Sequence, residues 1–223
     1  MSEKIIKSAD RVKDIGEVFT PKRIVNMMLD QPEITAKIND LEATFLEPSA
    51  GEGAFLVELL KRKLAVAEQE GNSIQDRQDK FLLALSTLYG IELMEDNLNM
   101  LITNMRNTFQ DLYNHAFSPE EQDNKVVKSA NTIIAANMLQ GDALKRVNKQ
   151  GMPLIFSEWK PLPKGKVMRT EFTFDSILEN GPSTGTVSSQ YEQLDLFSDS
   201  EDESKKMQFQ PCKWHDIYKE KLK

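Results

Sequence analysis

FLEPSAGEGAFLVELL, residues 45–60, has the pattern of a short buried strand, a turn with two glycines and the start of an amphipathic helix. Gly51 and Gly53 let the backbone approach a ligand closely, and the first amides of the following helix have no partner within the helix. Such a turn is typical of a cofactor cradle at the carboxyl end of a strand. The alternative is a tight strand-to-helix turn that holds no ligand, so the neighbouring segments must decide.

Two further segments continue the alternation of strands and helices. FLLALSTLYGIEL (residues 81–93) contains a strand that should end at Glu92, and TIIAANMLQGDAL (residues 132–144) contains one that should end near Asp142. A helix with one apolar face is expected between them, over about residues 95–113. This alternation predicts an α/β fold, with a parallel sheet that carries helices on both faces.

An acidic residue stands at the end of each expected strand: Glu47, Glu92 and Asp142. In a parallel sheet these ends meet at one edge, where ligands bind. Glu92 suits the two hydroxyls of a ribose, and Asp142 can accept a hydrogen bond from an adenine amino group. Each acid alone is more typical of a solvated cap residue than of a binding site. Three of them at one edge indicate a site for a nucleoside.

Four segments, in chain order, resemble the motifs of a known family. They are GEVFTP (residues 16–21), FLEPSAGEGAF (45–55), YGIEL (89–93) and GDAL (141–144). Together they are similar to the S-adenosylmethionine-binding motifs of the amino-group DNA methyltransferases, of the N6-adenine kind found in restriction–modification systems. The resemblance spans residues 15–144 and implies a Rossmann-like S-adenosylmethionine-dependent methyltransferase fold with an incomplete parallel sheet.

The resemblance also implies which residues bind the cofactor. Residues 19–21 would hold its methionine end, and the glycine turn would line its methionine and sulfonium region. Glu92 would bind the ribose hydroxyls and Asp142 the adenine amine. The full implied set is Phe19, Thr20, Pro21, Glu47, Pro48, Ser49, Ala50, Gly51, Gly53, Glu92 and Asp142.

The base-binding motif of that family is not present in its usual form. Methylation of an adenine amine needs a flipped base that is held by an Asn side chain and a Pro carbonyl and stacked on an aromatic ring. The family supplies these groups as Asn-Pro-Pro-Tyr. The nearest string is FDSILENGPS (residues 174–183), which offers Asn180 as a catalytic candidate but lacks the first proline and the aromatic. The alternative for residues 173–179 is a short capped helix that leads into a disordered tail.

The missing motif leads to two functional hypotheses. In the first, the chain is one half of a split adenine-specific DNA methyltransferase, inactive alone, whose partner subunit supplies the base pocket and target recognition. In the second, it is a catalytically silent, methyltransferase-like binding module that acts through protein contacts. The net charge of −7 argues against an unaided grip on DNA and favours DNA contact through a partner.

The composition changes after the cofactor-binding region, which is expected to be a domain over residues 1–150. Residues 151–180 should form an appended β-hairpin, because two β-favouring runs flank the connector KPLPKG. Residues 181–206 are rich in Ser, Gly, Asp and Glu and are expected to form a disordered acidic linker. Residues 207–223 are expected to form a short helix that docks onto the rest of the chain through Trp214 and Ile217. The hairpin, or another polypeptide, should cover the sheet edge that the incomplete fold exposes.

The linker contains the string QLDLF: Gln193, Leu194, Asp195, Leu196 and Phe197. It resembles the pentapeptide by which bacterial polymerases and repair proteins bind the replication sliding clamp. The alternative is that its apolar residues pack back onto the chain's own sheet edge.

Composition excludes several other classes of protein. The single cysteine, Cys212, rules out an internal disulfide framework and leaves too few thiols for a structural zinc site, so no metal is expected. Apolar runs stay well below membrane-spanning length, and the first residues lack the apolar core of a secretory signal. The expected location is therefore the cytoplasm, without membrane contact.

Overall fold

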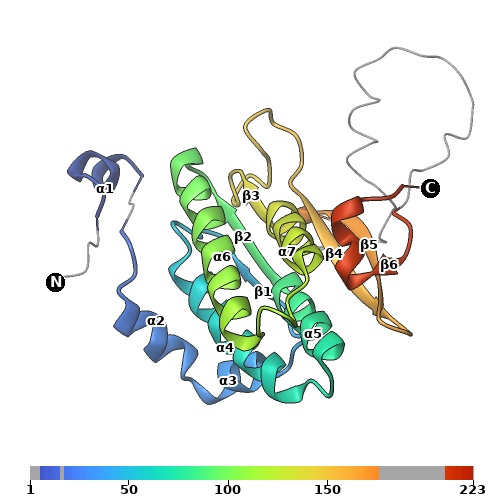
Figure 1. The fold of residues 1–223 in the computed structure, drawn as a ribbon. Coiled ribbons are helices and arrows are strands. Elements are labelled where there is room, and N and C mark those ends of the chain that lie inside the picture. The colour runs from blue at the N-terminus through green and yellow to red at the C-terminus, as the bar shows by residue number, and fades with distance from the viewer. Residues whose placement is uncertain (1–5, 16–17, 176–208, 223) are drawn as a thin grey trace, which may run out of the picture.

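The structure, a computed structural model, is α/β and describes residues 6–15, 18–175 and 209–222 (Figure 1). Its strands are β1 (Phe45–Glu47), β2 (Leu88–Glu92), β3 (Met138–Gln140), β4 (Ile155–Leu162), β5 (Lys166–Thr173) and β6 (Cys212–Lys213). Its helices are α1 (Ala9–Ile15), α2 (Lys22–Leu29), α3 (Pro32–Ile38), α4 (Ala54–Glu70), α5 (Ile74–Ser86), α6 (Glu95–Ala116), α7 (Asn124–Asn137) and the 3₁₀ helix η1 (Trp214–Lys219). Within these ranges every helix falls short of the length and apolarity that crossing a bilayer requires.

Strands β1, β2 and β3 form a parallel sheet in that order, with β2 in the centre. The prediction of helices on both faces of this sheet is wrong: helices α4 to α7 pack against one another and cover a single face (Figure 1). Strand order explains the difference. The two crossovers progress in the same direction across the sheet, and because such crossovers are right-handed they must lie on the same side.

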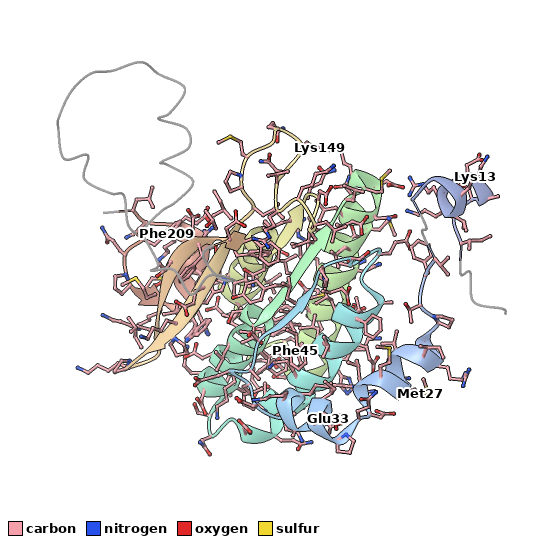
Figure 2. The ribbon with its side chains drawn as sticks, turned by 180° about the vertical axis from the view of Figure 1, so that it is seen from behind. Lys13, Met27, Glu33, Phe45, Lys149 and Phe209 are labelled. Atoms are coloured by element: carbon pink, nitrogen blue, oxygen red, sulfur yellow. The ribbon has the colours of Figure 1, made fainter. Side chains whose placement is uncertain are left out.

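The β4–β5 hairpin covers part of the opposite face of the sheet. Figure 2, turned by 180° from Figure 1, shows the molecule from that side. Tyr89 and Ile91 of β2 pack there in a small cluster that includes Phe156 of β4 and takes no residue from α4 to α7. The Tyr89 and Phe156 rings meet edge to face at 5.6 Å, and the Tyr89 hydroxyl donates to the Ser157 carbonyl at 2.9 Å. Leu46 of β1 remains 43% exposed, so the hairpin covers the central part of this face and leaves β1 open.

The main core lies between the sheet and the helices. Gly90 in the central strand permits this close packing, because a Cβ atom there would lie 2.8 Å from Leu56 Cδ1 and 3.0 Å from Met138 Sδ. A side chain at this position would push α4 away from the sheet. The glycine that ordinarily weakens a strand is therefore required by the approach of the helix.

The segment before β3 differs from its predicted form. Residues 132–137 belong to α7, and β3 is only three residues long. Asp123 caps α7 by accepting a hydrogen bond from the Lys125 amide at 2.9 Å, and Ile133 and Ile134 are fully buried. Their burial at helical spacing outweighs the β preference of branched side chains.

Asn137, at the end of α7, joins the two sheets. Its side chain is fully buried, and its amide donates to the carbonyls of Ser86 and Leu88 at 3.0 and 3.1 Å. Its carbonyl oxygen accepts from the Trp159 indole at 3.0 Å. All three hydrogen bonds are buried, and they hold the hairpin against the end of α5 and the start of β2.

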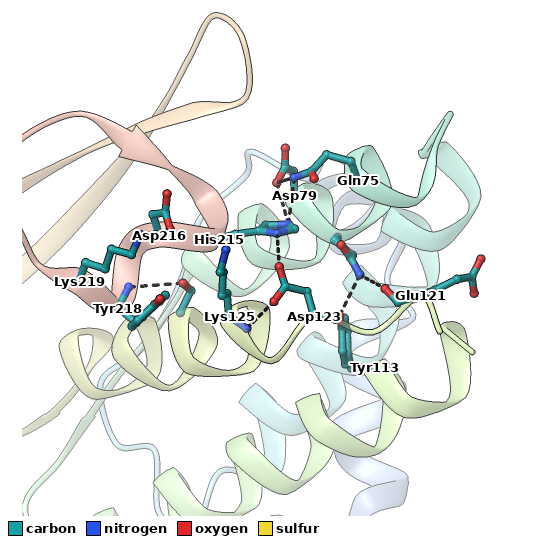
Figure 3. A network of polar contacts seen from close by, with 12 residues as sticks. Gln75, Asp79, Tyr113, Glu121, Asp123, Lys125, His215, Asp216, Tyr218 and Lys219 are labelled. Atoms are coloured by element: carbon teal, nitrogen blue, oxygen red, sulfur yellow. Dashed lines mark hydrogen bonds and ion pairs between the residues drawn. The ribbon is translucent and has the colours of Figure 1, made fainter. Parts of the chain in front are cut away.

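The C-terminal residues return to the body of the protein. Strand β6 pairs with β5, and Trp214 and Ile217 of η1 are buried against α7. His215 lies between two carboxylates, 3.2 Å from Asp79 and 3.3 Å from Asp123 (Figure 3). Burial acts to lower the pKa of His215, but the hydrogen bonds and charges of the two acids outweigh it and raise the pKa above its usual value.

We predict that His215→Gln destabilises the protein in a pH-dependent way. The raised pKa means that protonated His215 stabilises the fold below its unfolded pKa of about 6.5, and that this contribution is lost as the pH rises through the folded pKa. Urea unfolding near pH 6 should show a loss of about 1–3 kcal/mol, which shrinks at higher pH. His115→Gln, at an exposed position, is the control. A difference that stays constant with pH would contradict the charged contact.

Candidate functional site

A cleft of about 630 Å³ opens between the glycine turn, residues 47–53, and one side of α6. The segment 18–21, just before α2, forms another wall. The cleft therefore brings two of the four sequence motifs together at the carboxyl end of β1. The predicted residues that line it are Phe19, Thr20, Pro21, Glu47, Ser49, Ala50, Gly51 and Gly53.

The glycine turn has a backbone that other residues adopt only with strain. Gly51 and Gly53 have positive φ values of 55° and 95°, and Gly53 is the N-cap of α4. Its amide donates to the Ala50 carbonyl at 2.9 Å, which closes the turn. A Cβ atom on Gly53 would lie 2.6 Å from Leu101 Cδ1 in α6. The second glycine thus sets both the direction of α4 and its close approach to α6.

Glu92, at the end of β2, holds the glycine turn in place through its side chain. The residue is 5% exposed, and its carboxylate accepts three hydrogen bonds: from the Gly51 amide at 2.7 Å, the Met94 amide at 2.9 Å and the Asn97 side chain at 3.2 Å. Glu92 is not among the residues that line the cleft. Its predicted role as a ribose ligand stays a prediction, and it requires that ligand hydroxyls replace some of these donors.

Asp142 lies two residues beyond β3 and forms a local turn. Its carboxylate accepts from the amides of Leu144 and Lys145 at 3.0 and 3.1 Å and lies 3.2 Å from the Lys145 ammonium. The hydrogen bond from the Lys145 amide is the main cause that lowers the pKa of Asp142. Asp142 is at the same edge of the sheet as Glu92, whose carbonyl accepts from the Gly141 amide at 3.0 Å, but it does not line the cleft.

The remaining predicted positions fall elsewhere. Pro48 is within the glycine turn but is not part of the cleft wall. Asn180 and the clamp-like residues 193–197 lie outside the residues that the structure describes. The site is thus defined by the glycine turn, the segment 18–21 and α6.

The cleft favours a positively charged ligand. Its walls carry the carboxylates of Glu47, Glu52 and Asp111, and the described lining includes no Lys, Arg or His. Glu52 already pairs with the Lys7 ammonium at 2.9 Å, so the charge that a ligand would meet comes mainly from Glu47 and Asp111. Burial raises the pKa of Glu47, although the hydrogen bond from the Ser49 amide at 3.2 Å acts in the opposite direction. A cation placed beside Glu47 would offset this cost of burial and favour the ionised acid.

The sequence did not indicate the wall that α6 contributes. Its residues are polar and follow helical spacing: Asn104, Asn107, Thr108 and Asp111. The side-chain amide of Asn104 donates to the backbone carbonyl of Glu52 at 2.9 Å, so this wall is fixed to the glycine turn. The same spacing is typical of any solvent-facing helix surface, and it therefore gave no specific signal.

Comparison of the chain with protein-family models, with curated proteins and with solved structures gave no match. Among the residues that the structure describes, His, Cys, Asp and Glu nowhere gather in a group of three or more that could hold a metal ion. The chemistry of this site must therefore be inferred from the cleft.

We predict that Gly53→Ala is far more damaging than Gly51→Ala. At Gly53 an alanine combines an unfavourable φ of 95° with a clash against Leu101, which should cost about 2–3 kcal/mol. At Gly51 the φ of 55° is a left-handed conformation that alanine reaches for about 1 kcal/mol, and the nearest atom, on Phe19, is 3.7 Å away. Urea unfolding of both variants measures the difference. Equal losses would show that the turn is not held against α6.

Proposed function

We propose that the chain binds S-adenosylmethionine in the cleft and is the cofactor-binding part of an adenine-specific DNA methyltransferase with a Rossmann-like fold. The main support is an acidic cleft beside a glycine turn at the carboxyl end of a parallel strand. The order of the four sequence motifs adds to it. The volume of about 630 Å³ is within the range of small-molecule sites.

The charges of the cofactor match those of the cleft. S-adenosylmethionine carries a sulfonium and an ammonium cation next to one carboxylate, whereas the cleft presents Glu47 and Asp111 and has no Lys, Arg or His in its described lining. Glu52 contributes less to this match, because its carboxylate already pairs with the Lys7 ammonium at 2.9 Å. Two opposite charges about 4 Å apart attract by about 4 kcal/mol before desolvation at an effective dielectric constant of about 20. This attraction favours the cationic cofactor over its neutral thioether product.

The proposed reaction transfers a methyl group to a base that has been flipped out of DNA. The adenine amine attacks the methyl carbon, the carbon–sulfur bond breaks with its electron pair on sulfur, and the amine loses one proton. S-adenosylhomocysteine is the second product. Asn180, this chain's own candidate for holding the base, lies outside the described residues. Because the sequence has no Asn-Pro-Pro-Tyr motif and carries a net charge of −7, we place the base pocket and the main DNA contacts on a partner subunit.

We predict that Glu47→Gln weakens S-adenosylmethionine more than S-adenosylhomocysteine. Loss of a charged contact should cost the cationic ligand about 1–3 kcal/mol, and less for the product, which retains only the ammonium. Because the pKa of Glu47 is raised, the affinity of the wild-type chain should also fall as the pH is lowered through that pKa, whereas the variant should not show this dependence.

Titration calorimetry with both ligands provides the measurement. Glu68→Gln, an exposed acid on α4, is the matched control and should bind like the wild type. A wild-type chain that binds neither ligand would refute the proposed function. Equal losses for the two ligands would place the sulfonium away from Glu47.

A separate prediction distinguishes the split enzyme from a silent binding module. Transfer of tritiated methyl groups to unmethylated DNA should be near background for the chain alone and should rise well above it when a subunit with an Asn-Pro-Pro-Tyr motif is added. Both hypotheses include cofactor binding, so only the transfer assay separates them. Strong incorporation by the chain alone would mean that it carries a complete base pocket. No incorporation with a genuine partner would favour the silent module, in which contact with a sliding clamp remains a proposal.

A further inference from the structure

The N-terminal segment of residues 6–15, here called the strap, is joined to the cleft by Lys7. The Lys7 ammonium lies 2.9 Å from the Glu52 carboxylate and 3.0 Å from that of Asp96. It also donates to the side-chain carbonyl of Asn97. Arg11, four residues further along the strap and within α1, adds a contact with Asp96 at 2.8 Å.

Lys7 thereby connects parts of the protein that are far apart in the sequence. Glu52 belongs to the glycine turn and lines the cleft, whereas Asp96 and Asn97 are in the first turn of α6. The ammonium is also 5.9 Å from the centre of the Phe19 ring, which lines the cleft and packs beside Gly51. Burial acts to lower the pKa of Lys7, but its hydrogen bonds to Glu52 and Asp96 raise it, so Lys7 remains charged.

The contact with Asn97 extends the influence of Lys7 to Glu92. An ammonium can only donate hydrogen bonds and a carboxylate can only accept them. Asn97, whose side chain is buried between the two, must therefore turn its oxygen to Lys7 and its amide group to Glu92. Lys7 fixes the orientation of the amide, and the amide fixes one oxygen of the carboxylate that holds the Gly51 amide.

We propose that Lys7 is a positioning residue for the cofactor: the docked strap holds the glycine turn, Asn97 and Glu92 in the arrangement that binds the nucleoside. This inference rests on the proposed function and adds a residue that none of the four motifs contains. Lys7 does not itself line the cleft and acts through Glu52 and Asn97.

Lys7 could instead affect binding only through its charge, and the two roles have opposite consequences. Removing a cation near an acidic cleft would strengthen the binding of cationic ligands and leave a neutral nucleoside unaffected. Loss of positioning would weaken both kinds of ligand. Methylthioadenosine, a neutral nucleoside, and S-adenosylmethionine are therefore the two probes to compare.

Reciprocity supplies a second readout. If the docked strap increases the affinity for the nucleoside by some factor, the nucleoside must favour the docked strap by the same factor. Amide hydrogen exchange over residues 6–13 should therefore slow when methylthioadenosine or S-adenosylmethionine is added to the full chain. A lysine with a purely structural role would leave this exchange independent of ligand.

The experiment compares Lys7→Met and Lys7→Arg with Lys13→Met, a matched control at an exposed position of the strap, in helix α1. We expect Lys7→Met to weaken the binding of both ligands by about tenfold, which is within the range typical of coupled sites. The variant should also lose the ligand-dependent change in hydrogen exchange. Lys7→Arg should restore most of the affinity, and Lys13→Met should match the wild type. Thermal unfolding of each variant shows whether the fold is retained.

Three outcomes would overturn the inference. If the wild type binds both ligands and Lys7→Met binds them equally well, the inference about Lys7 is refuted and the proposed function is not. Stronger binding of S-adenosylmethionine with unchanged methylthioadenosine would assign Lys7 a purely electrostatic role. A wild-type chain that binds neither ligand would refute the proposed function, and the inference with it.

Discussion

The hydrogen bond between the Gly51 amide and the Glu92 carboxylate ties the cleft to the sheet. It crosses from the turn after β1 to the end of β2, beside a backbone bond from the Ala50 amide to the Ile91 carbonyl at 2.9 Å. A buried carboxylate is costly unless donors surround it, and Glu92 has three. The turn, the start of α4 and one wall of the cleft are therefore fixed by a charge that must remain satisfied.

Much of the sheet and the glycine turn could be predicted because local patterns determine them. The strand before Glu47, the two-glycine turn and the end of β2 at Glu92 follow from apolar runs and punctuation over a few residues. The position of the helices could not be predicted in this way, since it depends on strand order, which no local pattern encodes. The end of helix α7 was predicted as a strand. Ile133 and Ile134 have branched side chains that favour strands and lie just before a short strand, so their helical burial cannot be recognised from the sequence alone.

The site shows the same division between local and distant information. The segment 18–21 and the glycine turn meet in one cleft, as the motifs implied, but Asp142 is occupied by its own turn and Glu92 faces inward. The polar wall of α6 and the contact of Lys7 with Asn97 join residues that no shared motif connects. Such contacts depend on side-chain geometry across the folded chain, so only the structure could reveal them.

The C-terminal residues return to β5, so two segments that are far apart in the sequence are held together by strand pairing. Residues 166 and 167 pair directly with residues 213 and 212, and η1 adds its buried Trp214 and Ile217 to the main core. The polypeptide link between Asp175 and Phe209 is therefore backed by a non-covalent junction between the segments that it joins. A single break in that link would leave two fragments with a complementary interface, so the C-terminal piece could in principle be supplied as a separate peptide.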